Sequence, residues 1–253
     1  MNDIALVINT VHKNHDLWAM FFGQLDKFLD MSIAKYVFVD EAGQGLPEDI
    51  SVILYDETKT YKEQFASCIG EVKEKYCIYI SEDYILYDQV QRERILHYKK
   101  VLDEEKDLSF IRFMKGGVVE LKFLQYQTYE NLYQLYNFLP YFYTNQVALW
   151  RTRDLEKIHQ LGPKLHIGNM DYENSFEFQA TKTCEELGIQ GVFCHYGEPK
   201  RGLYHYDCEV FPHISTALVK GKWNLAEYPN ELSPLLEEYN INIEERGVFD
   251  VGS

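Results

Sequence analysis

The chain has 253 residues, of which 46% are hydrophobic and 26% are charged, a balance typical of a globular protein with a full core. Forty acidic residues against 25 basic ones give a formal net charge of −15, which disfavours binding to nucleic acids and to anionic lipid headgroups. An anionic ligand would therefore need a local basic pocket or a metal ion. The 20 tyrosines suit sites for flat or hydroxylated ligands.

The first half of the chain alternates between strand-like and helix-like segments. The predicted strands are Ile4–Asn9, Tyr36–Val39, Ser51–Tyr55, Tyr76–Ile80 and Leu108–Phe113. The predicted helices are Asn14–Leu29, Tyr61–Tyr76 and Gln89–Leu102. This alternation predicts an α/β fold with a mostly parallel sheet that helices cover on both faces.

The second half is less regular. Its predicted elements are a strand edge or loop feeding a helix over Val147–Gln160, a helix over Met170–Leu187, a strand over Ile189–His195, an irregular loop over Gly197–Pro212 and a partly helical tail over Leu235–Glu245. We find no internal repeat and no low-complexity linker. We therefore expect one domain over residues 1–253, with a first half of 1–115 and a second half of 116–253.

The first residues carry no basic segment or cleavage site of a signal peptide, and no run approaches the roughly 20 apolar residues of a membrane span. The five cysteines are odd in number and lack CxxC spacing, which is typical of cytoplasmic free thiols. The cluster Cys194-His195, His205 and Cys208 fits no known zinc-ligand spacing. We therefore expect a cytoplasmic protein.

Acidic residues follow several of the predicted strands. They are Asp40-Glu41, Asp56 and Glu82-Asp83. Ligands of open α/β sheets bind beyond the carboxyl ends of the strands, so these side chains are expected near the site. Carboxylate oxygens at that edge favour a divalent cation, which would reverse the local sign of charge.

The segment Tyr76–Leu86, an apolar strand followed by Ser81-Glu82-Asp83, resembles the Asp-x-Asp region of GT-A glycosyltransferases. The helix before it and the order of elements over residues 4–115 are similar as well. The resemblance implies a GT-A-like Rossmann-type sheet with an acceptor-side C-terminal half. It also implies sugar transfer from a UDP- or GDP-sugar donor to a hydroxyl of a glycan or glycolipid, with polysaccharide biosynthesis as the setting.

The motif departs from the family pattern because Ser81 replaces the first carboxylate. Asp83 stands where the family's usual metal ligand does, so the resemblance implies that Asp83 holds Mn²⁺ or Mg²⁺. Glu82 would then contact the donor ribose or the sugar. The alternative is that Glu82-Asp83 only caps a turn.

The resemblance also implies a metal ligand from a C-terminal loop, for which His213 is the first candidate and His205 the second. Lys200-Arg201 in the same loop could neutralise the departing diphosphate, or could be an ordinary solvated pair. Three further residues are placed by position as contacts to the base and ribose: Thr10, Asp56 and Tyr61.

Inverting transfer requires a general base near the acceptor hydroxyl. In the GT-A enzymes that this sequence resembles, the base is a carboxylate at the start of a helix, and Asp171 and Glu173 occupy that place. Glu177, four residues further on, lies on the same helix face as Glu173. The alternative for Asp171 is helix capping. A retaining mechanism would need no such base.

An aromatic run could line an acceptor groove. It comprises Tyr126, Tyr129, Tyr133, Tyr136, Phe138, Tyr141, Phe142 and Tyr143, with Trp150 beyond it. The spacing of its first four tyrosines is also that of a helix with a core-facing stripe.

Two other functions remain open. A sugar-phosphate nucleotidyltransferase normally has a Gly-rich loop after the first strand, and Asn9–His15 contains no glycine. A non-catalytic sugar- or nucleotide-binding protein would explain the incomplete metal motif.

Overall fold

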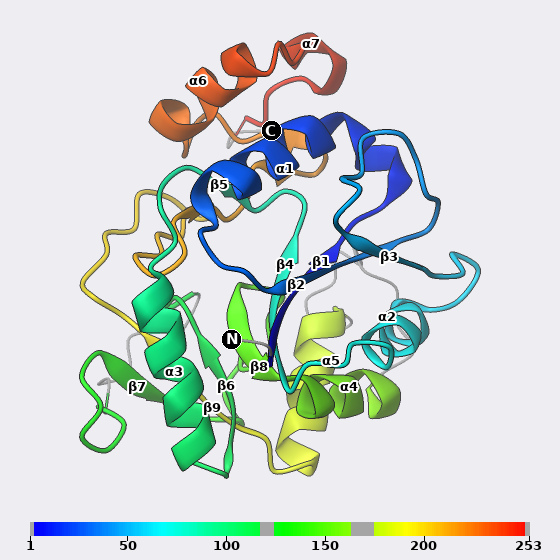
Figure 1. Ribbon diagram of the computed structural model, residues 1–253. Coiled ribbons are helices and arrows are strands. Elements are labelled where there is room, and N and C mark those ends of the chain that lie inside the picture. Colours follow the sequence, from blue (N-terminus) through cyan, green and yellow to red (C-terminus); the bar gives the residue numbers. More distant parts are fainter. Residues whose placement is uncertain (1–2, 117–123, 163–174, 251–253) are drawn as a thin grey trace.

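A computed structural model describes residues 3–116, 124–162 and 175–250 (Figure 1). The described residues form an eight-stranded sheet with the order β3-β2-β1-β4-β8-β6-β9-β7. Its strands are β1 (Ile4–Asn9), β2 (Ala34–Val39), β3 (Ser51–Leu54), β4 (Tyr76–Ser81), β6 (Leu108–Arg112), β7 (Leu132–Leu135), β8 (Ala148–Arg151) and β9 (Gln190–Cys194). Strands β1 to β4 are parallel to one another, as the alternating pattern predicts.

Helices cover both faces of this sheet. Helices α1 (Trp18–Phe28) and α3 (Arg92–Glu104) pack on the face that carries Ile4, Leu6 and Ile8. Helices α2 (Tyr61–Ile69), α4 (Thr152–Leu161) and α5 (Phe176–Glu186) pack on the face that carries Ala5 and Val7. Successive side chains of a strand point to opposite faces, so a continuous apolar run such as β1 is buried on both.

The C-terminal part of the chain adds a layer beyond α1 (Figure 1). It contains the short strands β10 (His213–Ile214), β11 (Leu218–Val219) and β12 (Lys222–Trp223), and the helices α6 (Pro229–Glu238) and α7 (Ile243–Arg246). Strand β10 pairs with β5 (Ile85–Leu86), just beyond the acidic motif. A short 3-10 helix, η1 (His12–Leu17), connects β1 to α1.

Strand β8 lies in the middle of the sheet, between β4 and β6, rather than at an edge. It runs antiparallel to both β4 and β6, and Leu149 faces Ile78 on one side and Ile111 on the other. Buried strands have the same apolar composition in either direction, so the sequence could not show this orientation. Because β8 is antiparallel, the residues before it lie at the carboxyl edge of β4.

The helical interpretation of the tyrosine run is wrong. No helix lies between residues 124 and 147, where the chain forms turns and the edge strand β7. Gln127, Asn131 and Tyr141 have φ values of 51°, 60° and 60°. Left-handed residues end a right-handed helix, so these three positions interrupt the period that the tyrosines suggest. Similarly, α2 ends at Ile69, before Gly70, rather than at Tyr76.

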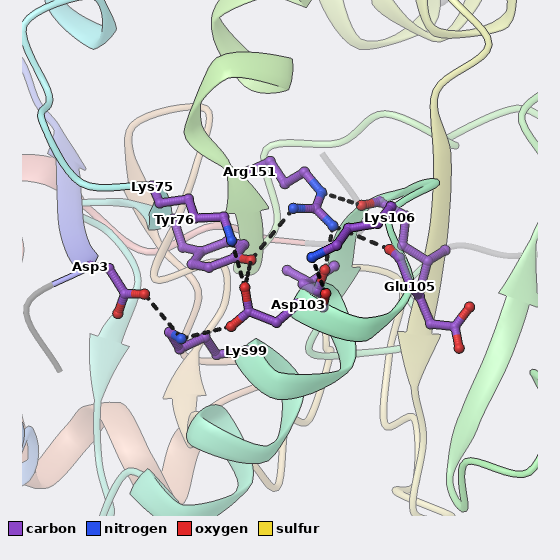
Figure 2. Close-up of polar contacts among 10 residues, drawn as sticks. Asp3, Lys75, Tyr76, Lys99, Asp103, Glu105, Lys106 and Arg151 are labelled. Atoms are coloured by element: carbon purple, nitrogen blue, oxygen red, sulfur yellow. Dashed lines mark hydrogen bonds and ion pairs between the residues drawn. The ribbon is translucent and has the colours of Figure 1, made fainter.

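A polar network joins α3 to the amino edge of the parallel strands (Figure 2). The Asp103 carboxylate pairs with the Nζ atoms of Lys75 and Lys99 at 2.5 and 2.7 Å, and it accepts a hydrogen bond from the Tyr76 hydroxyl at 2.7 Å. These donors hold the pKa of Asp103 well below its ordinary value, with Lys75 the largest contributor.

Arg151, the last residue of β8, completes that network. Its Nε atom donates to the Leu108 carbonyl at 2.6 Å, and its Nη2 atom donates to the carbonyls of Leu102 and Glu105. A guanidinium at the end of α3 satisfies carbonyls that have no partner within the helix and complements the helix dipole. In the described ranges, no helix combines the length and apolarity that crossing a bilayer demands.

Candidate functional site

Three adjoining cavities form a groove along the carboxyl edge of β1 and β4. The large cavity, about 570 Å³, is lined by Tyr84, Tyr141, Thr144, Gln146, Glu177, Lys200, Leu203, Tyr204, Tyr206, Ser215 and Thr216. The middle cavity, about 390 Å³, is lined by Asn9, Asn14, Tyr79, Ser81, Glu82, Asp83, Tyr84, Asn145, Ser215, Thr216, Leu218, Gly221 and Arg246. The small cavity, about 300 Å³, is lined by Asn9, Thr10, Val11, Tyr55, Tyr61, Gln64 and Glu82.

The shared residues show how the cavities connect. The middle cavity shares Tyr84, Ser215 and Thr216 with the large one, and Asn9 and Glu82 with the small one. Parallel strands bring their carboxyl ends to one edge of the sheet, which is where ligands of open α/β folds bind. The groove therefore lies where the sequence predicts a site.

The acidic motif occupies the centre of the groove. Ser81 ends β4 opposite Asn9 of β1, and Glu82 and Asp83 follow it. Glu82 is buried, and its Oε1 atom accepts a hydrogen bond from Asn14 Nδ2 at 2.5 Å. Burial raises the pKa of Glu82, while the Asn14 hydrogen bond and the Arg246 charge act in the opposite direction. Burial, with the adjacent Glu82 charge, raises the pKa of Asp83 to about 8.

Two cationic side chains line the groove at different points. Arg246, at the end of α7, lines the middle cavity and forms an ion pair with Asp16 at 2.5 Å. Lys200 lines the large cavity, where its Nζ atom lies 3.9 Å from the centre of the Tyr206 ring. Burial lowers the pKa of Lys200 below its ordinary value. The groove therefore combines carboxylates with separate cations rather than carrying one sign of charge.

Glu177 brings a third carboxylate to the groove, at the start of α5. It lines the large cavity, and its Oε1 atom accepts a hydrogen bond from the backbone N–H of Asn145 at 2.8 Å. The Ser175 hydroxyl caps the helix by accepting from the Phe178 amide. Burial raises the pKa of Glu177, and Asn145 and the buried guanidinium of Arg112 partly oppose that shift.

Of the three residues predicted to contact the base and ribose, two line the groove and one does not. Thr10 and Tyr61 line the small cavity, although the Tyr61 hydroxyl already lies 3.0 Å from the Tyr79 hydroxyl. Asp56 is exposed, lies outside the lining of all three cavities, and accepts hydrogen bonds from Thr58.

Lys200 and Arg201 are adjacent in sequence, but their side chains have different partners. Lys200 faces the large cavity, whereas Arg201 is absent from the cavity linings and pairs with Glu231 of α6 at 2.7 Å. His205 is fully buried and lies within hydrogen-bond distance of Arg201 and Asp207. The Arg201–Glu231 pair attaches the irregular segment Gly197–Pro212 to the C-terminal layer.

The two predicted metal ligands lie at different depths. Asp83 lines the middle cavity, whereas His213 is fully buried and lines none of the three cavities. The His213 Nδ1 atom lies 2.5 Å from the Phe211 carbonyl oxygen, and burial lowers the pKa of the imidazole to about 4. Within the described residues, no group of three or more His, Cys, Asp and Glu side chains is placed to hold a metal ion.

The predicted bases Asp171 and Glu173 lie outside the described residues. Of the aromatic run, Tyr141 lines the large cavity, whereas Tyr143 and Trp150 are buried in the core. Sequence reasoning missed Arg246, Ser215 and Thr216 as groove residues. The first is more than 160 residues from the acidic motif along the chain, and no local pattern marks any of them.

No protein-family model matches the sequence, and no curated protein matches it. Among solved structures, CMP:2-keto-3-deoxy-manno-octonic acid synthetase complexed with CTP has a TM-score of 0.52 at 10% identity, covering 80% of this chain and 93% of the synthetase. TarS 1–349 of S. aureus in complex with UDP-GlcNAc has a TM-score of 0.47 at 13% identity, covering 87% of this chain and 62% of that one.

The mannosyltransferase PcManGT of Pyrobaculum calidifontis, in complex with GDP-Man and Mn²⁺, has a TM-score of 0.45 at 12% identity, covering 79% of this chain and 58% of that one. The chain thus spans about 60% of the length of the TarS fragment. At these identities the similarity concerns the fold. The sheet order and the helices on both faces give this chain a mixed α/β, GT-A-like Rossmann-type fold, similar to that of the synthetase.

Proposed function

We propose that this chain is a glycosyltransferase that moves a sugar from a nucleoside-diphosphate sugar to a hydroxyl of a glycan or glycolipid. The observation that carries the proposal is the groove, in which an acidic pair separates a small cavity from a large one at the carboxyl edge of a GT-A-like sheet. We also propose that the chain acts as one domain, since both halves contribute residues to this groove.

The donor nucleotide occupies the small and middle cavities in this proposal. Thr10 and Tyr61 border the nucleoside, and Glu82, at the junction of both cavities, accepts hydrogen bonds from it. A carboxylate has about four lone-pair positions, and the Asn14 amide uses one of those on Glu82, so acceptor capacity remains for a ligand. Asp56 contributes no contact in this arrangement.

A divalent cation fits this groove through Asp83. Mg²⁺ is commonly held by one or two carboxylates together with the phosphates of the substrate, so a single groove-lining carboxylate suffices. Mn²⁺ or Mg²⁺ bound there would supply Lewis-acid stabilisation of the departing diphosphate. His213 lines none of the three cavities, but its Nε2 atom is buried without a hydrogen-bond partner among the described residues, and we propose it as a second ligand.

The acceptor occupies the large cavity in this proposal. Tyr141, Tyr204 and Tyr206 offer aromatic faces to a sugar ring, and Lys200 offers a cation. An inverting transfer needs a base at the acceptor hydroxyl, and Asp171 or Glu173 remains our proposal for it. Among the described residues, Glu177 is the carboxylate from this part of the sequence that lines the cavity.

We place the reaction in the cytoplasm. All five cysteines are buried free thiols, which a reducing compartment maintains.

Product analysis separates this proposal from its nearest rival. The chain is incubated with Mn²⁺ and either sugar nucleotides or nucleoside triphosphates with sugar phosphates, and the released phosphates are quantified. A glycosyltransferase consumes a sugar nucleotide and releases a nucleoside diphosphate, by transfer or by slow hydrolysis. Pyrophosphate release from a triphosphate would instead show a nucleotidyltransferase. Consumption of neither substrate class, even with added glycan acceptors, would contradict the proposal.

A further inference from the structure

The C-terminal helix α7 sends one side chain into the groove from more than 160 residues beyond the acidic motif. Arg246 Nε and Nη2 bind the Asp16 carboxylate at 2.6 and 2.5 Å. The same Nη2 atom donates to Asn14 Oδ1 at 3.1 Å. Arg246 therefore connects the end of the chain to the segment that follows β1.

The Asn14 amide transmits this contact to the acidic motif. Arg246 can only donate hydrogen bonds, so Asn14 must present its oxygen to Arg246 and its Nδ2 group to Glu82. Asn14 Nδ2 in turn can only donate, so the Glu82 oxygen that it meets acts as an acceptor. Each hydrogen bond thus fixes the direction of the next.

The tail that carries Arg246 is anchored by its backbone. The Trp223 amide donates to the Gly247 carbonyl at 3.0 Å, and the Phe249 amide donates to the Trp223 carbonyl at 2.9 Å. The Arg246 guanidinium also lies 6.0 Å from the centre of the Trp223 ring. Gly247 has a φ of 70°, a value that glycine adopts without strain, and this lets the chain turn from α7 toward β12.

A second anchor acts on Glu82 from Thr10, the residue that follows β1. The Thr10 hydroxyl accepts a hydrogen bond from Trp18 Nε1 at 2.9 Å, so its own hydrogen is directed elsewhere, and Glu82 receives a hydrogen bond from it. Glu82 is 7% exposed. Its carboxylate is therefore held from two sides at the junction of the small and middle cavities.

We propose that Arg246 and Asn14 are positioning residues, which fix the Glu82 carboxylate as a hydrogen-bond acceptor for the ribose hydroxyls of the bound nucleotide. The inference rests on the proposed function and deepens it, since it makes the C-terminal helix part of the nucleotide site. A dideoxyribose offers the carboxylate no hydroxyl donor, so a dideoxynucleotide should lose this contact.

Binding to the 253-residue chain tests this hydrogen-bond relay from Arg246 through Asn14 to Glu82. Calorimetry with Mn²⁺ compares UDP and GDP with their 2′,3′-dideoxy counterparts on the wild type, Arg246→Gln, Asn14→Ala, Glu82→Gln and the double variant Arg246→Gln/Glu82→Gln. The wild type is expected to bind one of the two ribonucleotides about tenfold more tightly than its dideoxy form, and each single variant is expected to reduce this ratio toward one. Asn14→Ala interrupts the relay without changing the C-terminal tail, so it still tests the proposal if Arg246→Gln does not fold.

The double variant separates positioning from general stability. If Arg246 acts through Glu82, adding Arg246→Gln to Glu82→Gln changes the ratio no further. The matched control is Arg94→Gln, which removes another arginine that pairs with a carboxylate, Glu209 at 2.8 Å, and lies over an aromatic ring. This control should keep the wild-type ratio.

The three possible failures are distinguishable. If the wild type binds a ribonucleotide tightly but Arg246→Gln and Asn14→Ala, folded by circular dichroism, keep the wild-type ratio, the relay is wrong and the proposed function stands. If the wild type does not discriminate against the dideoxy form, the ribose assignment is wrong. If the wild type binds neither UDP nor GDP, the donor site itself is overturned, and the relay proposal with it.

Discussion

Replacing Arg151 with methionine should destabilise the fold substantially while leaving the groove intact. The guanidinium donates to three carbonyls, those of Leu102, Glu105 and Leu108, and methionine keeps only part of its aliphatic packing. A hydrogen bond from a charged group contributes about 1.5 to 3 kcal/mol, and water can replace part of this at a partly exposed helix end. We therefore expect a loss of about 3 kcal/mol in the free energy of unfolding.

Urea denaturation followed by circular dichroism measures this loss. For a chain of this length, about 3 kcal/mol corresponds to a fall in Tm of about 6 to 12 °C. The control is Arg153→Met, an exposed arginine two residues further along the chain, which should change the free energy by less than about 0.5 kcal/mol. A loss below about 1 kcal/mol for Arg151→Met would refute the idea that this side chain holds the end of α3.

Further variants test the network and the groove. Asp103→Asn should lower the free energy of unfolding by about 1 kcal/mol at pH 7. Because the folded-state pKa of Asp103 is depressed, this difference from the wild type should shrink as the pH falls below about 3.8. Urea unfolding at pH 7 and pH 3 measures the difference. Asp83→Ala should weaken Mn²⁺-dependent nucleoside-diphosphate binding by at least about tenfold in calorimetry with the fold unchanged, and unaltered binding would move the metal elsewhere. Either Asp171→Asn or Glu173→Gln should keep donor binding within about twofold and lower turnover by about 10², whereas Glu177→Gln should leave turnover largely unchanged; loss of turnover in Glu177→Gln alone would contradict this assignment of the base.

The regular part of the fold was predictable because its signals are local. Apolar runs such as Ile4–Asn9 and the capping pair Thr60 and Glu63 identify elements within a few residues. The acidic motif after β4 was predictable for the same reason, since the ends of parallel strands define the ligand-binding edge.

The remaining features depend on information that no short window contains. The direction of β8 follows from its partners β4 and β6, and the tyrosine run is shaped by left-handed residues such as Asn131 and Tyr141. Arg246 and Asn14 are 232 positions apart, and only the folded chain brings them together. Lys200 and Arg201 show the converse, since neighbours in sequence point to different partners.

A crystal structure of the chain with UDP or GDP and Mn²⁺ would show directly whether the groove binds the donor. We expect the nucleoside in the small cavity with Glu82 bound to it, and the diphosphate with the ion beside Asp83 in the middle cavity. A nucleotide bound away from the carboxyl edge of β1 and β4, or none bound at saturating concentration, would contradict it.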